Sequence, residues 1–145
     1  MSDPSTHDLP FPSFAPYPDR DSEPYWAALA EGSFQLQRCD ECSALRWPPR
    51  ALCNRCHSFE SHWEDVARTG RIVSWTRTHQ VFAPDCRDKV PYLVVQVALE
   101  EQNDILLIGG WLAERTPGVN ERVRMKLVEA ADGLRLPCWQ PEDGV

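Results

Sequence analysis

The sequence predicts a mainly β protein in which a short N-terminal helix and a compact cysteine-rich segment precede a small barrel. Three observations lead to this prediction. One run near the N-terminus carries helix start and stop signals, four cysteines form two C-x-x-C pairs, and five strand-like runs follow without a helical pattern between them. Strand runs of this length and spacing favour a closed or partly closed barrel over a parallel sheet.

Length and charge exclude several classes of protein. The chain has 145 residues and a formal net charge of −7, and 42% of its residues are hydrophobic. This length suits one ordinary domain or two very small ones, which excludes a large enzyme with its own cofactor fold. The acidic balance opposes general attraction to nucleic acid or to an anionic membrane. Because neither a membrane-spanning run nor a signal peptide is evident, we expect a soluble, cytoplasmic protein.

Four segments are expected along the chain: an extended arm with a short helix, a cysteine-rich module, a barrel and a tail, at residues 1–32, 33–66, 67–141 and 142–145. The arm alternates prolines with Phe11, Phe14 and Tyr17, so it is either a disordered terminus or an arm whose rings dock on a neighbouring surface. The helix is expected to begin after Ser22 and to end at Gly32, because serine is a common N-cap and glycine a common terminator.

The strand prediction rests on β-branched and aromatic residues between turn signals. A first strand is expected at residues 33–38, where Phe34 and Leu36 alternate with glutamines. Gly109 and Gly110 interrupt one of the later runs, which predicts a bulge or a tight bend. The five barrel strands are expected at residues 71–82, 91–99, 104–112, 122–128 and 134–139.

The cysteine pairs are the strongest local signal. Cys39 and Cys42 form one pair, and Cys53 and Cys56 form the other after ten intervening residues. Each pair makes a hairpin knuckle that aims two sulfurs at one point, and two knuckles supply the four tetrahedral ligands that zinc prefers. Four thiolates leave no open position, so the ion would be structural. A rubredoxin-type iron site and a pair of redox dithiols remain as alternatives.

The other ionisable residues give no convincing catalytic set. His57 follows the last ligand and is interpreted as a surface or supporting histidine. Cys86, between Asp85 and Arg87, is interpreted as an incidental loop thiol, with a reactive nucleophile as the alternative. Cys138 is interpreted as a packing residue at the end of a strand. We therefore predict no catalytic residue in this chain.

The order of these features resembles a known family. The segments PYWAALAEGSFQLQRC, CDECSALRWPPRALCNRC and HWEDVARTGRIVSWT are similar to the family of acyl-CoA-associated proteins known as domain-of-unknown-function family thirty-five. The resemblance covers roughly residues 20 to 141. It implies an N-terminal helical arm, a rubredoxin-like zinc ribbon and a five-stranded OB-fold barrel. Gly70 matches the glycine that opens the barrel, and Pro91 and Pro137 match two strand prolines.

This chain departs from the family pattern in two loops. Family members often have a Glu-Gly turn between the second and third barrel strands, where this chain has Glu101-Gln102-Asn103. They also often have a glycine before the fourth strand, where this chain has Asn120-Glu121. We therefore expect these two loops to differ in detail from those of the family.

The resemblance implies a non-catalytic accessory subunit that organises a thiolase-like enzyme acting on acyl-CoA, as in lipid or steroid degradation. The partner would be a thiolase, a retro-aldolase or an acyltransferase in a hetero-oligomer, and this chain could help to shape the acyl-CoA channel. Tyr25, Trp26 and Trp47 are the predicted partner contacts, since interface energy concentrates in buried tryptophan and tyrosine. Arg46 and Arg50 are candidate contacts for the acyl-CoA phosphates.

Two other functions remain open at this point. The chain could bind acyl-CoA on its own through its arginines. It could also bind single-stranded nucleic acid, because zinc ribbons and OB-folds are both used for that purpose. The second alternative is opposed by the acidic balance and by the presence of only two lysines, Lys89 and Lys126.

Overall fold

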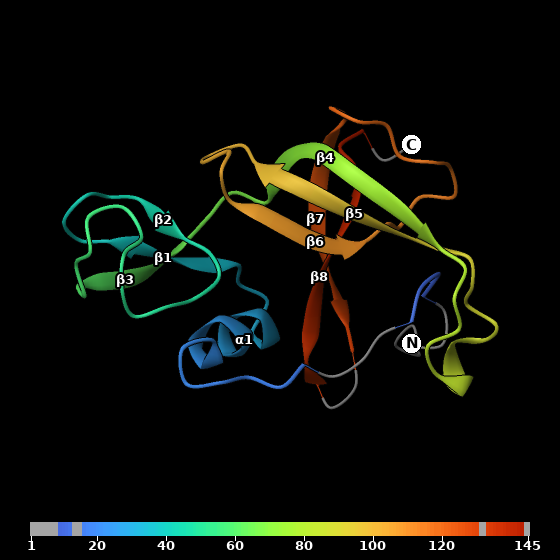
Figure 1. Cartoon of the computed structure of the whole chain (residues 1–145), viewed down its shortest axis with the longest axis horizontal. Coiled ribbons are helices and arrows are strands. Elements are labelled where there is room, and N and C mark those ends of the chain that lie inside the picture. Colours follow the sequence, from blue (N-terminus) through green and yellow to red (C-terminus); the bar gives the residue numbers. More distant parts are fainter. Residues whose placement is uncertain (1–8, 13–15, 131–132, 144–145) are drawn as a thin grey trace.

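The computed structural model describes residues 9–12, 16–130 and 133–143. Much of the predicted arm, including Phe14, lies outside the described residues, as do the last two residues of the predicted tail. Figure 1 shows a small sheet at one end of the molecule, a larger sheet at the other, and a short helix between them on one side. This mainly β arrangement confirms the predicted fold class. No helix in the described part of the chain is long and apolar enough to cross a membrane.

Helix α1 spans Glu23–Ala30 and buries Tyr25, Ala28 and Leu29. Ser22 occupies the N-cap position as predicted, but its hydroxyl bonds backwards: the Asp19 N–H donates to Ser22 Oγ at 3.0 Å, and the Ser22 N–H donates to Asp19 Oδ1 at 2.7 Å. After the helix, Gly32 has a φ of +90° and donates its N–H to the Leu29 carbonyl at 2.9 Å. Glycine suits this left-handed position, and the helix ends there.

The smaller sheet belongs to the cysteine-rich module. Strand β1 (Gln35–Cys39) lies in its centre and pairs antiparallel with β2 (Leu45–Arg46) and β3 (Ser61–Asp65). Phe34 and Leu36 are buried, as the alternation predicts. Gln37 was expected on the opposite, polar side, yet it is also buried, and its Oε1 accepts the Arg50 N–H at 2.9 Å. Both sides of β1 are therefore covered by the chain.

The larger sheet has the strand order β6-β5-β4-β7-β8 among the described residues. Its edges approach each other, because Trp111 and Trp139 form a parallel bridge in which the Leu112 N–H donates to the Trp139 carbonyl at 2.9 Å. The short helix η2 (Pro84–Cys86) lies in the chain between β4 and β5. The strands are β4 (Thr69–Thr78), β5 (Tyr92–Leu99), β6 (Leu106–Gly110), β7 (Arg122–Glu129) and β8 (Arg135–Pro141).

The sequence predicted a bulge or a tight bend at Gly109 and Gly110. The bulge was wrong, because both glycines pair in regular register with β5. The register shift lies in β4, between Ile72 and Ser74. The glycines instead allow close approach. A Cβ on Gly109 would lie 2.6 Å from the Pro137 carbonyl oxygen of β8, and a Cβ on Gly110 would lie 2.4 Å from the ring of Phe11. Missing side chains therefore let β6 cross β8 and let the arm pack on the sheet.

One loop of the barrel clamps the cysteine-rich module in place. Gln102, between β5 and β6, accepts the Leu45 N–H at 2.8 Å and donates to the Leu45 carbonyl at 3.1 Å, so its amide pairs with β2 as a neighbouring strand would. Its neighbours form ion pairs with the same module, Glu101 with Arg38 at 2.8 Å and Asp104 with Arg55 at 2.5 Å. The loop that departs from the family pattern therefore fixes the module against the barrel.

Replacing Gln102 with alanine should loosen this junction. The Leu45 N–H and carbonyl would lose both partners, which we expect to lower the free energy of unfolding by about 1–2 kcal/mol. Chemical unfolding measures the loss, and faster hydrogen exchange at the Leu45 amide would place it at the junction. The neighbouring Asn103→Ala serves as the control, since Asn103 is exposed. Equal effects of the two variants would show that the clamp does not stabilise the protein.

Candidate metal centre and aromatic pocket

The two knuckles have matching backbone geometry. In the first, the Ser43 N–H donates to the Cys39 carbonyl at 3.0 Å, and in the second the His57 N–H donates to the Cys53 carbonyl at 3.0 Å. Ser43 and His57 both adopt a φ of +65° directly after a cysteine. This left-handed residue turns each loop back on itself, so that both sulfurs of a pair face the same point. His57 is exposed and lies outside the four-sulfur cluster.

The four sulfurs fit one tetrahedral ion. The Sγ atoms of Cys39, Cys42, Cys53 and Cys56 all lie within 4.8 Å of one another. Across the knuckles, Cys39 Sγ lies 3.5 Å from Cys56 Sγ, and Cys42 Sγ lies 3.6 Å from Cys53 Sγ. Four sulfurs at zinc–sulfur distances of about 2.3 Å would lie about 3.8 Å apart. The cysteines are thus placed to bind one structural zinc ion.

Backbone N–H groups in the knuckles favour the thiolate form that a metal requires. Hydrogen bonding from the Cys42 backbone lowers the pKa of Cys39. Hydrogen bonding from the Cys56 and Arg55 backbone lowers the pKa of Cys53 to about 6. N–H groups aimed at sulfur stabilise its negative charge, which is the physical cause of both shifts. The local fold therefore prepares two of the four sulfurs as anionic ligands.

Arg46 is enclosed in the same module. Only 1% of this residue is exposed, and its guanidinium donates to the carbonyls of Arg50, Ala51, Ser58 and Glu60 at 3.1–3.3 Å. These carbonyls belong to the segments on both sides of the second knuckle. Arg46 therefore ties that knuckle to β2, and its guanidinium could reach a phosphate only if the module opened.

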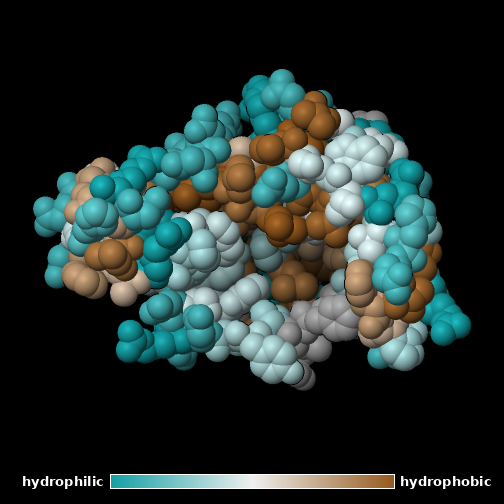
Figure 2. Space-filling model, in the orientation of Figure 1, coloured by the Kyte–Doolittle hydropathy of each residue, from teal (hydrophilic) through white to brown (hydrophobic). Residues whose placement is uncertain are grey.

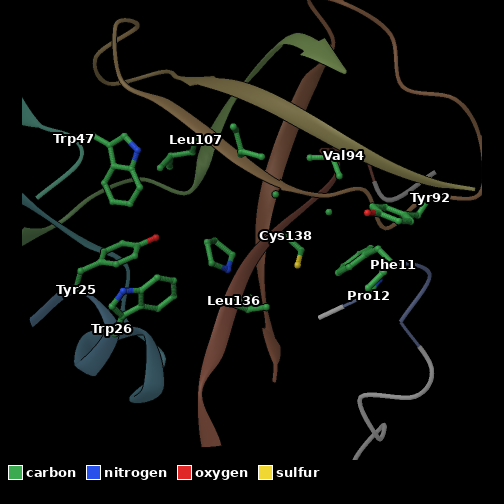
Figure 3. A pocket seen from close by; sticks show the side chains of 14 residues that line it. Phe11, Pro12, Tyr25, Trp26, Trp47, Tyr92, Val94, Leu107, Leu136 and Cys138 are labelled. Carbon is green, nitrogen blue, oxygen red and sulfur yellow. The ribbon is translucent and has the colours of Figure 1, made fainter. Parts of the chain in front are cut away.

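An aromatic pocket lies where the arm, α1, the cysteine-rich module and the barrel meet. It is a cavity of about 260 Å³, and none of the described residues that line it carries a formal charge. Figure 3 shows Trp47, Tyr25 and Trp26 on one side, with Tyr92, Phe11 and Pro12 facing them across the cavity. The remaining lining comes from β5, β6 and β8: Val94, Leu107, Ile108, Gly109, Gly110, Leu136, Pro137 and Cys138.

Both the cysteine-rich module and the barrel match domains of known proteins. Residues 26–61 match the rubredoxin-like zinc ribbon domain of ChsH2, and residues 63–138, more than half of the chain, match the ChsH2 C-terminal OB-fold domain. The chain belongs to the ChsH2 family. This confirms the predicted zinc ribbon and OB-fold, and the family resemblance seen in the sequence.

Solved structures with this fold include the following two. The first, described as the Ltp2-ChsH2(DUF35) aldolase, superposes with a TM-score of 0.77 at 29% identity, over 88% of this chain and 98% of that one. The second is a protein of unknown function of the DUF35 family from Sulfolobus solfataricus. It has a TM-score of 0.57 at 12% identity and covers 87% of this chain and 88% of that one, so it supports the fold alone.

A curated relative is longer than this ChsH2 family member. It is described as a probable enoyl-CoA hydratase alpha subunit from Thermomonospora curvata, and it is 30% identical over 125 residues. The match covers 85% of this chain but only 38% of the relative. The chain thus spans less than half the length of this relative.

The predicted partner contacts of this ChsH2 family member lie together. Tyr25 is almost fully buried, and its ring packs edge-on against those of Trp26, Phe34 and Trp47, with centroids 4.9–6.4 Å apart. Trp26 and Trp47 are partly buried and form one wall of the aromatic pocket. Their role in binding a partner stays a prediction. Tyr25 is better placed to support the two tryptophans than to contact a partner itself.

The two predicted phosphate contacts have different exposure. Arg46 is enclosed as described above, whereas Arg50 is partly exposed and donates to the carbonyls of Trp47 and Pro48 beside the pocket. Sequence reasoning missed the opposite wall, formed by Phe11, Pro12 and Tyr92. The only signal for that wall was the aromatic spacing of the arm, which does not reveal where the arm docks.

The remaining cysteines are buried. Cys86 lies in η2 and Cys138 in β8, with 3% and 2% of each residue exposed. Burial raises the pKa of Cys138 to about 12.

Because the thiolate is the reactive form, iodoacetamide should leave Cys138 unmodified in the native protein between pH 7 and 9 and modify it once urea unfolds the chain. Peptide mass mapping measures this, and equal labelling rates in both states would refute it.

Proposed function

We propose that this chain is an accessory subunit that binds and organises a larger, thiolase-like enzyme acting on acyl-CoA substrates. The observation that carries the proposal is the match over 98% of a chain in a structure whose description names two proteins, Ltp2 and ChsH2, together as an aldolase. The curated relative, described as a subunit of a probable enoyl-CoA hydratase, supports the link to acyl-CoA chemistry.

The chemistry of the site agrees with a supporting role. Four cysteines occupy all four positions of a tetrahedral ion, so substrate or water has no open position on the metal. The described lining of the aromatic pocket offers apolar surface and no charged group for acid–base work. In this proposal the partner supplies the catalytic groups, and this chain supplies a rigid surface held by zinc.

Copurification tests the proposal. The tagged chain, expressed in the organism that encodes it and identified with its partners by mass spectrometry, should bring down a stoichiometric thiolase-like subunit. The assembly should act on acyl-CoA, while the isolated chain should show no turnover. Purification of the chain as a stable species without a partner, or turnover by the chain alone, would contradict the proposal.

Direct binding of acyl-CoA is the second candidate, because Arg50 lies beside an apolar pocket. In this alternative its guanidinium would pair with a CoA phosphate. Calorimetry of the isolated zinc-loaded chain with an acyl-CoA distinguishes the two: heat of binding that disappears in Arg50→Gln would favour the alternative.

A cytoplasmic location also belongs to the proposal, and the six unpaired cysteines suit a reducing compartment.

A further inference from the structure

The outer surface of the barrel carries an uncharged face on two neighbouring strands, β5 and β6. On β5 and β6 the side chains that alternate with the core point outward, and we call their positions the apolar face. Ile108 is 65% exposed and Leu106 is 38% exposed, although both are large aliphatic residues. The apolar face consists of Val94, Gln96, Ala98, Leu106, Ile108 and Gly110, and the ring of Phe11 covers it at Gly110.

The register of the strands places these residues side by side. Val94 lies opposite Gly110, Gln96 opposite Ile108, and Ala98 opposite Leu106. None of the six positions carries a charge, in a chain with 26% charged residues. Figure 2 shows hydrophobic residues gathered around a hollow on this side of the molecule. Contiguous exposed apolar surface on a soluble domain typically marks an interaction site.

The apolar face continues into two hollows. Val94 and Ile108 line both the aromatic pocket and a second cavity of about 200 Å³ beside Trp75 on β4. Small-molecule sites usually enclose about 300–1,000 Å³ and cover most of the ligand. Each of these two hollows is smaller than that, and an open face connects them. Such a surface suits a protein partner that inserts one or two large side chains into each hollow.

Two arginines lie at the rim of the hollows, and their charge indicates which residues a partner would present opposite them. Arg50 donates to the carbonyl of Trp47, and the guanidinium of Arg77 lies 5.8 Å from the centroid of the Trp75 ring. The two arginines therefore stand beside a tryptophan of each hollow, although the chain as a whole has a net charge of −7. Complementary potentials across an interface call for acidic residues opposite them.

We propose that the apolar face, the two hollows and these arginines form the surface that binds the partner enzyme, which presents an uncharged apolar segment flanked by acidic residues. This inference rests on the proposed function. It adds that the centre of the interface lies on β5 and β6, with Trp26 and Trp47 as one wall of the aromatic pocket. The zinc ribbon contributes by holding Trp47 in that wall.

A charge at Ile108 tests the surface once copurification has identified the partner. Ile108→Glu should weaken binding of that purified partner by about 30-fold or more, because the carboxylate would be desolvated without an ionic partner. Val119→Glu is the matched control, since Val119 is 66% exposed and lines neither hollow. Both variants should keep the wild-type melting temperature and zinc content. Wild-type affinity of a folded Ile108→Glu would overturn the inference while leaving the proposed function intact.

Hydrogen exchange of the wild-type assembly gives a second test that needs no variant. Binding of the partner should slow exchange at residues 92–98 and 106–110 more than at residues 119–126. The same measurement with octanoyl-CoA alone should leave the first two segments unchanged. Absence of protection there in the assembly, or equal protection by octanoyl-CoA, would overturn the inference. Failure to find any partner would instead remove the proposed function together with it.

Discussion

Replacing Cys53 with serine is expected to abolish stoichiometric zinc binding and to unfold the ribbon while the barrel remains folded. Cys53 is fully buried, and its sulfur lies 3.6 Å from that of Cys42 across the two knuckles. Structural zinc contributes about 10–16 kcal/mol in small zinc-finger peptides, which is as large as the whole folding free energy of a typical domain. Loss of the metal should therefore release β2 and Trp47 from the wall of the aromatic pocket.

Zinc content and hydrogen exchange measure this result. The wild-type protein should contain one zinc ion per chain and slow amide exchange at β1 and β2, and Cys53→Ser should show neither. Cys86→Ser is the matched control, because Cys86 is also buried but lies outside the four-sulfur cluster. It should retain one zinc ion. A ribbon that stays protected in metal-free Cys53→Ser would show that the cysteines do not hold it by binding a metal.

Replacing Gly70 with alanine is expected to lower the free energy of unfolding by about 3 kcal/mol or more. Gly70 lies in β4 between Leu99 of β5 and Val123 of β7. A Cβ at this position would lie 2.3 Å from the Ala98 carbonyl oxygen and 2.7 Å from Val97 Cγ1. Because the nearest atom belongs to the backbone of a central strand, the sheet itself would have to shift to relieve the clash.

A second glycine provides the control for this effect. A Cβ on Gly118 would meet only the Glu121 carboxylate among the described residues, at an ordinary 3.5 Å, so Gly118→Ala should change the free energy of unfolding by no more than about 0.5 kcal/mol. Urea unfolding of the three zinc-loaded proteins measures both values. Similar stabilities of Gly70→Ala and the wild type would mean that the close packing of β4 against β5 is not a constraint on the barrel.

Local sequence patterns were sufficient to predict helix α1, strand β1, the barrel strands and the cysteine cluster, but not β2 or β3. The two C-x-x-C pairs predicted a cluster that the structure brings together, because each pair is a local turn whose geometry follows from its spacing. The barrel strands also lie where alternation and β-branched residues placed them. For example, the run 122–128 became β7 (Arg122–Glu129), with Val123 and Met125 facing the core.

Hydrogen bonds from polar side chains to the backbone of other segments could not be predicted in this way. Gln102 pairs with Leu45 across 57 positions of sequence, and Arg46 forms hydrogen bonds to carbonyls that an extended chain would present to water. Neither residue type carries a local signature for such a role. The same applies to Phe11, which packs where Gly110 lacks a side chain, a match visible only after folding.

Native mass spectrometry of the assembly purified from the organism that encodes the chain can detect zinc and a bound partner in the same spectrum. We expect a complex in which each copy of this chain carries one zinc ion and is bound to a larger enzyme subunit. Two results would contradict this expectation. One is a folded chain whose mass includes no metal, and the other is a zinc-loaded chain that is bound to no partner and converts an acyl-CoA by itself.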